Sequence, residues 1–255
     1  MQQTDDTWWV VQPLLFSIRE SVYSLSMLAQ AGRVQDCYAI SRQIYETAVN
    51  AAFILAGGPS AAMRAKQHAL QKTYRENIRV LEINDPFIQV APNFSIDISQ
   101  HPALQAALAE FTSKKGREIT PWTPETVEQR VEAIGQRYGR FVAASLKIAL
   151  FGIYRNASEV VHGTLFGSLL LLGFTRPQGP PDSEAALEKY RRGLLCMLLM
   201  LIGTTLNSLI EVIAQELDVP ELTQRSRDLF NPIKSEPWNC GANDSEGAPG
   251  EQATS

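Results

Sequence analysis

The chain has 255 residues, of which 45% are hydrophobic and 20% are charged, so it is long enough to bury a large hydrophobic core. Its formal net charge of −4 excludes a protein that coats nucleic acid through bulk positive charge, and leaves room only for a local basic site. The three cysteines, Cys37, Cys196 and Cys240, are odd in number and widely separated, which argues against a disulfide framework or a zinc site of the CxxC type.

Apolar residues recur mostly at helical spacing, and no long alternating strand pattern is present, so the sequence predicts an all-α helical bundle. We expect a single helical domain over residues 1–230. A disordered C-terminal tail is expected over residues 231–255, which are rich in Gly, Pro, Ser, Asn and Glu and offer little to bury.

The N-terminal half is expected to form helices over residues 8–30, 34–55 and 61–81. The Gly57-Gly58-Pro59 sequence ends the second of these helices, and Ser60 is placed to N-cap the third. The pattern then breaks down around several prolines, which predicts a loop over residues 84–100.

In the next part of the chain, Pro102 begins a short predicted helix that runs to about residue 112. Thr123 as N-cap and Pro124 at the first helical position predict another helix over residues 124–135.

A mainly buried helix is predicted over 138–154, and the helix after it is completed by an apolar element over 165–174. A long helix from Ser183 to about 217 and a short segment over 220–230 follow.

Residues 194–213 are the strongest candidate for a membrane span, because they open with an apolar run over 194–202. Polar residues interrupt that run about halfway, whereas a spanning helix needs roughly 20 predominantly apolar residues. We therefore expect a buried core or dimer-interface helix, with a membrane-associated protein as the alternative. The acidic N-terminus lacks the basic region of a secretory signal. The three separate cysteines fit a reducing compartment, so we expect a cytoplasmic protein with no stable membrane insertion.

The third predicted helix carries the most basic face of the sequence. We favour a solvated helix surface as its explanation, and the alternative is a rail that follows an RNA backbone. The residues of this face are Arg64, Lys66, Lys72, Arg75 and Arg79.

Three ionisable side chains recur at helical spacing between two apolar segments, namely Arg155, Glu159 and His162. On one continuous helix they share a face, because positions four and seven residues apart fall within a narrow arc at about 100° per residue. The sequence Asn156-x-x-Glu159 also has the form of a capping box, which would start a new helix just after Arg155. Both geometries allow the three side chains to meet at one ligand.

His162 can serve as a general acid or base while the Arg155 guanidinium holds a phosphate. The structural alternative is an ion pair between Arg155 and Glu159, with His162 filling a packing gap. Arg42 and Glu46 repeat the same spacing in an apolar context, where charge is costly unless it is paired or functional. Two inward-facing pairs of this kind would form one polar pocket.

Arg155 and Asn156 followed by His162 resemble the Arg-polar-x-His signature of the HEPN superfamily. These are all-helical domains, and many are metal-independent ribonucleases that act as toxins or in phage defence. The resemblance implies that His162 is the acid or base acting on the RNA 2′-hydroxyl, that Arg155 is the phosphate clamp, and that Asn156 helps to position them. It also implies Glu46 as a supporting acid.

HEPN-like domains commonly pair through the helices that bear the motif. The resemblance therefore implies a homodimer through the apolar surface of residues 165–174 or of residues 194–202.

Tyr154, Ser158 and His162 are also similar to a Tyr-x-x-x-Ser-x-x-x-His signature shared by a family of uncharacterised bacterial helical proteins. With Arg42 and Glu46 upstream, this second resemblance spans residues 14–172.

The competing hypothesis is a non-catalytic helical binding module that recognises a small anionic ligand or a protein partner. The sequence has no GxxxxGK[ST] loop, GxGxxG, HExxH or GxSxG motif, so nucleotide hydrolysis, dinucleotide chemistry, zinc proteolysis and hydrolase-elbow catalysis lack support. The other histidines, His68 and His101, have no neighbouring ligands, and His68 is expected on the surface. We expect no metal and no cofactor.

Overall fold

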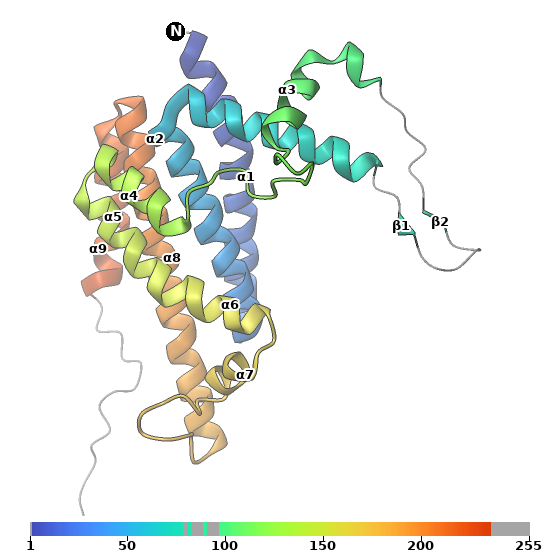
Figure 1. Cartoon of the computed structure of the whole chain (residues 1–255). Helices are drawn as coiled ribbons and strands as arrows, with labels where there is room; N and C mark the ends of the chain where they lie inside the picture. The colour runs from blue at the N-terminus through green and yellow to red at the C-terminus, as the bar shows by residue number, and fades with distance from the viewer. Residues whose placement is uncertain (1, 79–80, 83–88, 91–96, 236–255) are drawn as a thin grey trace, which may run out of the picture. The chain divides into compact units, whose positions relative to one another are not determined.

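The structure is a computed structural model of the chain, and it describes residues 2–78, 81–82, 89–90 and 97–235. Within these residues the chain is almost entirely helical, with nine α-helices (Figure 1). This confirms the predicted all-α class. The tail predicted over residues 231–255 lies outside the described residues from 236 onward.

The helices fall into two compact units, which are described separately below. The first unit contains residues 1–17 and 49–143, and the second contains residues 18–48 and 144–255. The two longest N-terminal helices, α1 (Gln2–Gln30) and α2 (Val34–Ile78), each contribute to both units.

α2 contains the second and third predicted helices as two arms. Gly58 has non-helical angles of φ 60° and ψ −146° between the arms, and Pro59 follows it. Only glycine adopts such a φ readily, and Pro59 cannot donate a backbone hydrogen bond, so the helical path breaks where the sequence indicated. The second arm ends at Ile78, three residues before the predicted end.

The first unit continues with a two-stranded antiparallel pair, β1 (Leu81–Glu82) and β2 (Gln89–Val90), in which Leu81 pairs with Val90. The predicted loop over 84–100 therefore contains β2 and a 3₁₀ turn, η1 (Ile98–Gln100), and much of its remainder lies outside the described residues. The next helix, α3 (Pro102–Glu110), begins at Pro102 as predicted.

α4 (Val127–Tyr138) starts three residues later than the sequence predicted. Its N-cap is Thr126, whose Oγ1 accepts from the N–H of Gln129 at 3.3 Å, while the Gln129 side chain accepts from the N–H of Thr126 at 2.8 Å. The prediction of Thr123 as the cap was wrong because this Thr126-x-x-Gln129 capping box satisfies two backbone donors at once. Thr123 instead donates its hydroxyl to Glu125.

In the second unit, α5 (Arg140–Ala149), a π-helical turn η2 (Leu150–Tyr154) and α6 (Arg155–Val161) follow one another without an extended residue between them; Arg140–Ala143 of α5 belong to the first unit. Tyr154 and Arg155 both have α-helical angles, and Asn156 lies inside α6. The capping box proposed at Asn156 was therefore wrong, because an N-cap residue must leave the helical region.

α7 (Leu165–Leu171) is a separate helix, so the prediction that this segment completes the preceding helix was wrong. His162 closes α6, Gly163 has a φ of 63°, and Thr164 then N-caps α7 by accepting from the N–H of Gly167 at 3.1 Å. A left-handed glycine followed by a threonine cap ends one helix and begins the next within three residues.

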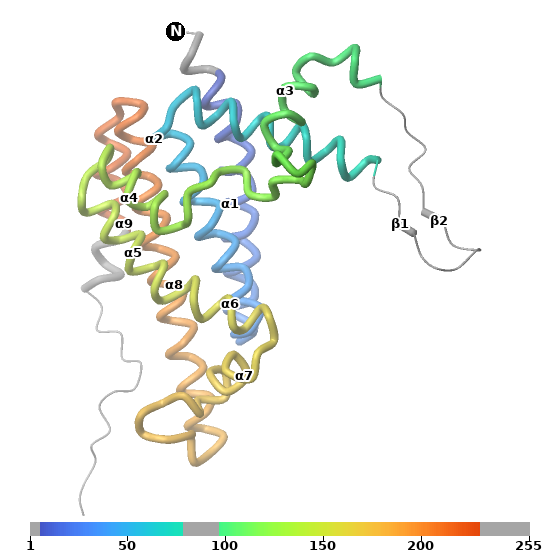
Figure 2. The backbone as a smooth tube through the Cα atoms, viewed as in Figure 1, coloured from blue at the N-terminus to red at the C-terminus, as the bar shows by residue number. Residues whose placement is uncertain are grey.

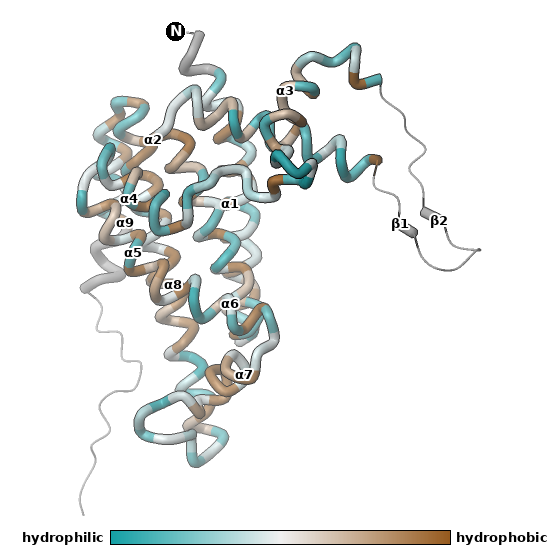
Figure 3. The backbone as a smooth tube through the Cα atoms, viewed as in Figure 1, coloured by the Kyte–Doolittle hydropathy of each residue, from teal (hydrophilic) through white to brown (hydrophobic). Residues whose placement is uncertain are grey.

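α8 (Glu184–Leu217) has the predicted Ser183 N-cap, whose Oγ accepts from the N–H of Ala186 at 3.2 Å. In the described part of the chain it is the one helix that is long and apolar enough to cross a membrane, and 44% of its most apolar window is buried in the protein. Figure 3 shows this apolar run as a brown stretch of α8. The cytoplasmic location therefore remains a prediction.

α9 (Pro220–Ser235) is longer than the segment predicted over 220–230 and folds back along α8 (Figure 2). The Ser226 hydroxyl donates to Asn207 Oδ1 at 2.6 Å, and Arg227 lies 3.8 Å from a Glu211 oxygen.

Candidate functional site

Three of the predicted site residues form one polar cluster in the second unit, namely Arg42, Glu46 and Tyr154. The Nε of Arg42 donates to Glu46 Oε1 at 3.0 Å, and the Arg42 guanidinium lies 4.7 Å from the centre of the Tyr154 ring. The Tyr154 ring in turn lies 6.4 Å from the ring of Tyr45, whose buried hydroxyl donates to the carbonyl of Leu146 at 3.0 Å. The cluster thus connects α2 to the π-helical turn.

In this geometry the Arg42–Glu46 pair helps to hold α2 against the π-helical turn. The Arg42 side chain is 22% exposed and has both a carboxylate and an aromatic face as partners. A guanidinium held in this way needs no further ligand for its charge. The Glu46 carboxylate is therefore paired with Arg42. The expected role of Glu46 as a supporting acid stays a prediction.

Arg155 and His162 differ from Arg42 because both are exposed. The Arg155 guanidinium lies 5.9 Å from the centre of the Phe151 ring, one turn earlier, and His162 uses its backbone N–H to donate to the carbonyl of Ser158 at 3.0 Å. Among the described residues, no side-chain hydrogen bond or ion pair holds either group. They are a cation and an imidazole available to a ligand.

Glu159 does not form the ion pair with Arg155 that the structural alternative required. Its carboxylate Oε2 accepts from the Thr164 hydroxyl at 2.7 Å, and its backbone carbonyl accepts from the N–H of Thr164 at 3.1 Å. Glu159 thus fixes the turn between α6 and α7. The half-buried Asn156 directs its amide toward the carbonyl of Gly152 at 3.5 Å, within the same helical segment.

Arg155 and His162 lie on one continuous helical segment, but the structure does not bring them into contact. Seven residues of helix separate them by about 10 Å along its axis, and the Arg155 guanidinium lies toward Phe151, on the side away from His162. The π-helical turn ends immediately before Arg155. Such turns are rare and frequently occur at functional sites.

Exposed apolar side chains lie on the same elements as this pair or on the elements next to them, α5, η2, α6 and α7, and we call them the apolar patch. Its residues are Ile148, Phe151, Val161, Leu165 and Phe166. Leu165 is 75% exposed, whereas Leu198, in the middle of the other predicted dimer surface, is fully buried. Of the two predicted dimer surfaces, residues 165–174 are therefore the more accessible, and residues 194–202 serve mainly the core.

The basic face of α2 has intramolecular partners along the part that the structure describes. Arg64 Nη1 lies 2.5 Å from Glu110, Lys66 lies 2.7 Å from Asp6, Lys72 lies 3.2 Å from Glu118, and Arg75 donates to Thr112 at 2.7 Å. Arg79 lies outside the described residues. These partners favour the structural explanation of the basic face over the RNA rail.

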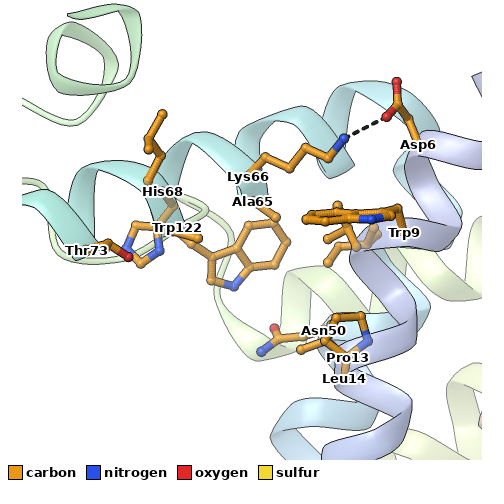
Figure 4. A pocket seen from close by; sticks show the side chains of 14 residues that line it. Asp6, Trp9, Pro13, Leu14, Asn50, Ala65, Lys66, His68, Thr73 and Trp122 are labelled. Carbon is orange, nitrogen blue, oxygen red and sulfur yellow. Dashed lines mark hydrogen bonds and ion pairs between the residues drawn. The ribbon is translucent and has the colours of Figure 1, made fainter. Parts of the chain in front are cut away.

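The first unit contains a pocket of about 930 Å³ that the sequence analysis missed. Figure 4 shows Trp9 of α1 and Trp122 of the segment before α4 beside the second arm of α2. His68 also lines the pocket; it is half-buried at the surface, as predicted, and a ring nitrogen lies 2.9 Å from the carbonyl of Thr120, a partner that the sequence did not indicate. No local motif signals this pocket, because its two tryptophans are more than a hundred residues apart in the sequence.

Among the described residues, no group of three His, Cys, Asp or Glu side chains is placed to hold a metal ion. The fold and these sites define an all-α helical protein with one exposed Arg and His pair and one aromatic pocket.

The chain belongs to the Family of unknown function (DUF5677), whose sequence pattern matches residues 9–178. The match covers the polar cluster, the Arg155 and His162 pair and the residues that line the pocket, except Asp6. Comparisons with curated proteins and with solved structures found no match.

Proposed function

We propose that this protein is an HEPN-like RNA-binding protein that cleaves RNA without a metal ion through Arg155 and His162. The observation that supports the proposal is that both side chains are exposed on one helical segment and lack a polar partner within the described chain. Phage defence or a toxin system is the proposed setting, since many proteins with the resembling signature act there.

In the proposed reaction, His162 accepts the proton of an RNA 2′-hydroxyl. The 2′-oxygen then attacks the adjacent phosphorus, the bond from phosphorus to the 5′-oxygen breaks, and the 5′-oxygen leaves as a hydroxyl after taking a proton from solvent water. Arg155 stabilises the negative charge that builds on the phosphate oxygens. Arg155 reaches that phosphate only after its exposed side chain turns away from Phe151, and such a rotamer change is rapid on a surface.

The test is incubation of the purified protein with total RNA in the presence of a chelator, beside Arg155→Ala and His162→Ala. Arg140→Ala is a matched control, because its guanidinium also lies over an exposed phenylalanine, 5.1 Å from the ring of Phe141. His101→Ala is the corresponding control for an exposed histidine. We expect 2′,3′-cyclic phosphate ends from the wild type and both controls, and at least about 100-fold less product from the two site variants.

A non-catalytic binding module is the second proposal, and the occupied Arg42–Glu46 pair favours it, since that pair would then serve packing alone. This module would recognise a small anionic ligand or a protein partner, so binding of inorganic phosphate without RNA cleavage, weakened in Arg155→Ala, would support this second function. If the folded wild type neither cleaves nor binds RNA, the first proposal is wrong.

A further inference from the structure

The pocket of the first unit has walls of a distinct chemistry. Two indole rings, Trp9 and Trp122, contribute to it together with aliphatic side chains of α1 and α2 (Figure 4). The pocket volume of about 930 Å³ is in the range that takes drug-sized ligands. Trp9 is 68% exposed, which is unusual for the largest apolar side chain unless a ligand or partner covers it.

The charged groups of the pocket neutralise each other. Lys66 Nζ lies 2.7 Å from Asp6 Oδ1 and 5.2 Å from the centre of the Trp9 ring. An anionic ligand group at Lys66 would have to displace Asp6, and a cationic group at Asp6 would have to displace Lys66. The pocket therefore favours an uncharged ligand.

Several polar groups at the pocket lack a full set of partners, which disfavours a purely aliphatic ligand. Asn50 Oδ1 accepts from Arg130, and no described group accepts from the Asn50 amide nitrogen. Pro13 has no N–H, so the Trp9 carbonyl four residues earlier lacks its usual helical donor. An aliphatic occupant would remove water from these groups without replacing its hydrogen bonds.

His68 adds one more directional group. The carbonyl of Thr120 can only accept, so the ring nitrogen of His68 that lies 2.9 Å from it must carry a hydrogen. In the neutral ring the other nitrogen, Nδ1, is then an acceptor. The pocket thus combines aromatic faces with polar groups and one internally neutral ion pair, Lys66 with Asp6.

We propose that this pocket binds an uncharged heteroaromatic molecule, which contacts the two indole rings and forms hydrogen bonds through its ring edge. This proposal does not depend on RNA cleavage, because Arg155 and His162 belong to the second unit.

The test measures binding of two uncharged heteroaromatic probes, adenosine and riboflavin, to the full-length protein by saturation-transfer NMR and by riboflavin fluorescence. We expect saturable binding of at least one probe. Trp9→Leu and Trp122→Leu should each weaken it by at least about tenfold, since stacking on one aromatic side chain contributes that much to base binding. Trp8→Leu is the matched control, because Trp8 does not line the pocket.

Trp122 also packs against Phe53, with ring centres 5.9 Å apart, so its replacement can disturb folding. Ala69→Trp avoids this difficulty because it fills the pocket from an exposed position on α2 and removes no core contact. We expect Ala69→Trp to abolish binding while the circular dichroism spectrum stays unchanged. Unchanged binding in folded Ala69→Trp, failure of both probes to bind saturably, or equal competition by the non-aromatic cyclohexanol would each overturn the proposal.

Discussion

The guanidinium of Arg42 lies over the face of Tyr154, 4.7 Å from the ring centre, and joins α2 to the π-helical turn that precedes Arg155. Arg42→Ala should lower the free energy of unfolding by about 1–2 kcal/mol, because it removes a half-buried stem and a contact between a cation and an aromatic face. Glu46→Ala should cost only about 0.5 kcal/mol, since the Glu46 side chain is 38% exposed and water replaces much of the ion pair. Urea unfolding curves measure both changes in free energy of unfolding. A larger loss of stability in Glu46→Ala than in Arg42→Ala would show that the contact between Arg42 and Tyr154 is not the main stabilising interaction.

Gly167 should tolerate no side chain. A Cβ there would lie 2.5 Å from the carbonyl oxygen of Glu159 and 2.8 Å from the backbone nitrogen of Val160, so α7 would have to move away from α6. We expect Gly167→Ala to lower the free energy of unfolding by about 1–3 kcal/mol. Gly193→Ala in α8 is the matched control, because nothing lies within 4 Å of its added Cβ and alanine favours the helix by up to about 1 kcal/mol. Equal effects of the two changes would show that the α6–α7 turn is looser than described.

The start of α4 depends on the side chain of Thr126. Thr126→Ala should destabilise the protein by about 1 kcal/mol, because it leaves the N–H of Gln129 without its acceptor at the first turn. Thr126→Ser keeps the hydroxyl and should restore most of the loss. Thermal unfolding followed by circular dichroism distinguishes the two, and full stability of Thr126→Ala would contradict the capping role.

Local chemistry explains which parts of the fold could be predicted from the sequence. Ser183 and the Gly58 break act through neighbouring backbone groups, so their roles were predicted correctly. Thr123 and Thr126 both satisfy the general pattern of an N-cap, and only the contact with Gln129 decides between them. The π-helical turn before Arg155 has no sequence signature, since it depends on how the segment packs.

The candidate site shows the same division. The spacing of Arg42 and Glu46 predicted their ion pair, which is local to one helix turn. The partner of Glu159 was missed because Thr164 approaches it only once the chain has turned between α6 and α7. The pocket beside Trp9 and Trp122 was missed for a related reason, since it exists only where distant segments of the first unit meet.

Cys37 gives the stability a dependence on alkaline pH. Its thiol is buried, and this burial together with the nearby Asp36 carboxylate raises the pKa of Cys37 from 9.0 to about 11. The folded state therefore holds the thiol proton more tightly than the unfolded chain does. The stabilisation is fully present below about pH 9 and is lost as the pH rises toward 11.

The measurement for this prediction is the difference in free energy of unfolding between wild type and Cys37→Ala at several pH values. This difference should be constant from pH 7 to about 8.5 and should shift against the wild type between pH 9 and 11. Comparison with the variant removes the contributions of other groups that titrate in the same range. A constant difference across the whole range would show that the Cys37 thiolate is not disfavoured in the folded state.

Leu165, at 75% exposure, is the most exposed residue of the apolar patch, and it lies next to Phe166 at the start of α7. We propose that a second copy of the chain covers this patch. Leu165→Glu should then convert a dimer to a monomer, because an interface core loses affinity when a charge is buried without a partner. Leu229→Glu is the matched control, since Leu229 is a 76% exposed leucine of α9 outside both predicted dimer surfaces. Light scattering after gel filtration gives the mass directly. A monomeric wild type at about 100 µM, or a dimer that Leu165→Glu leaves intact, would remove the apolar patch from consideration as the dimer surface.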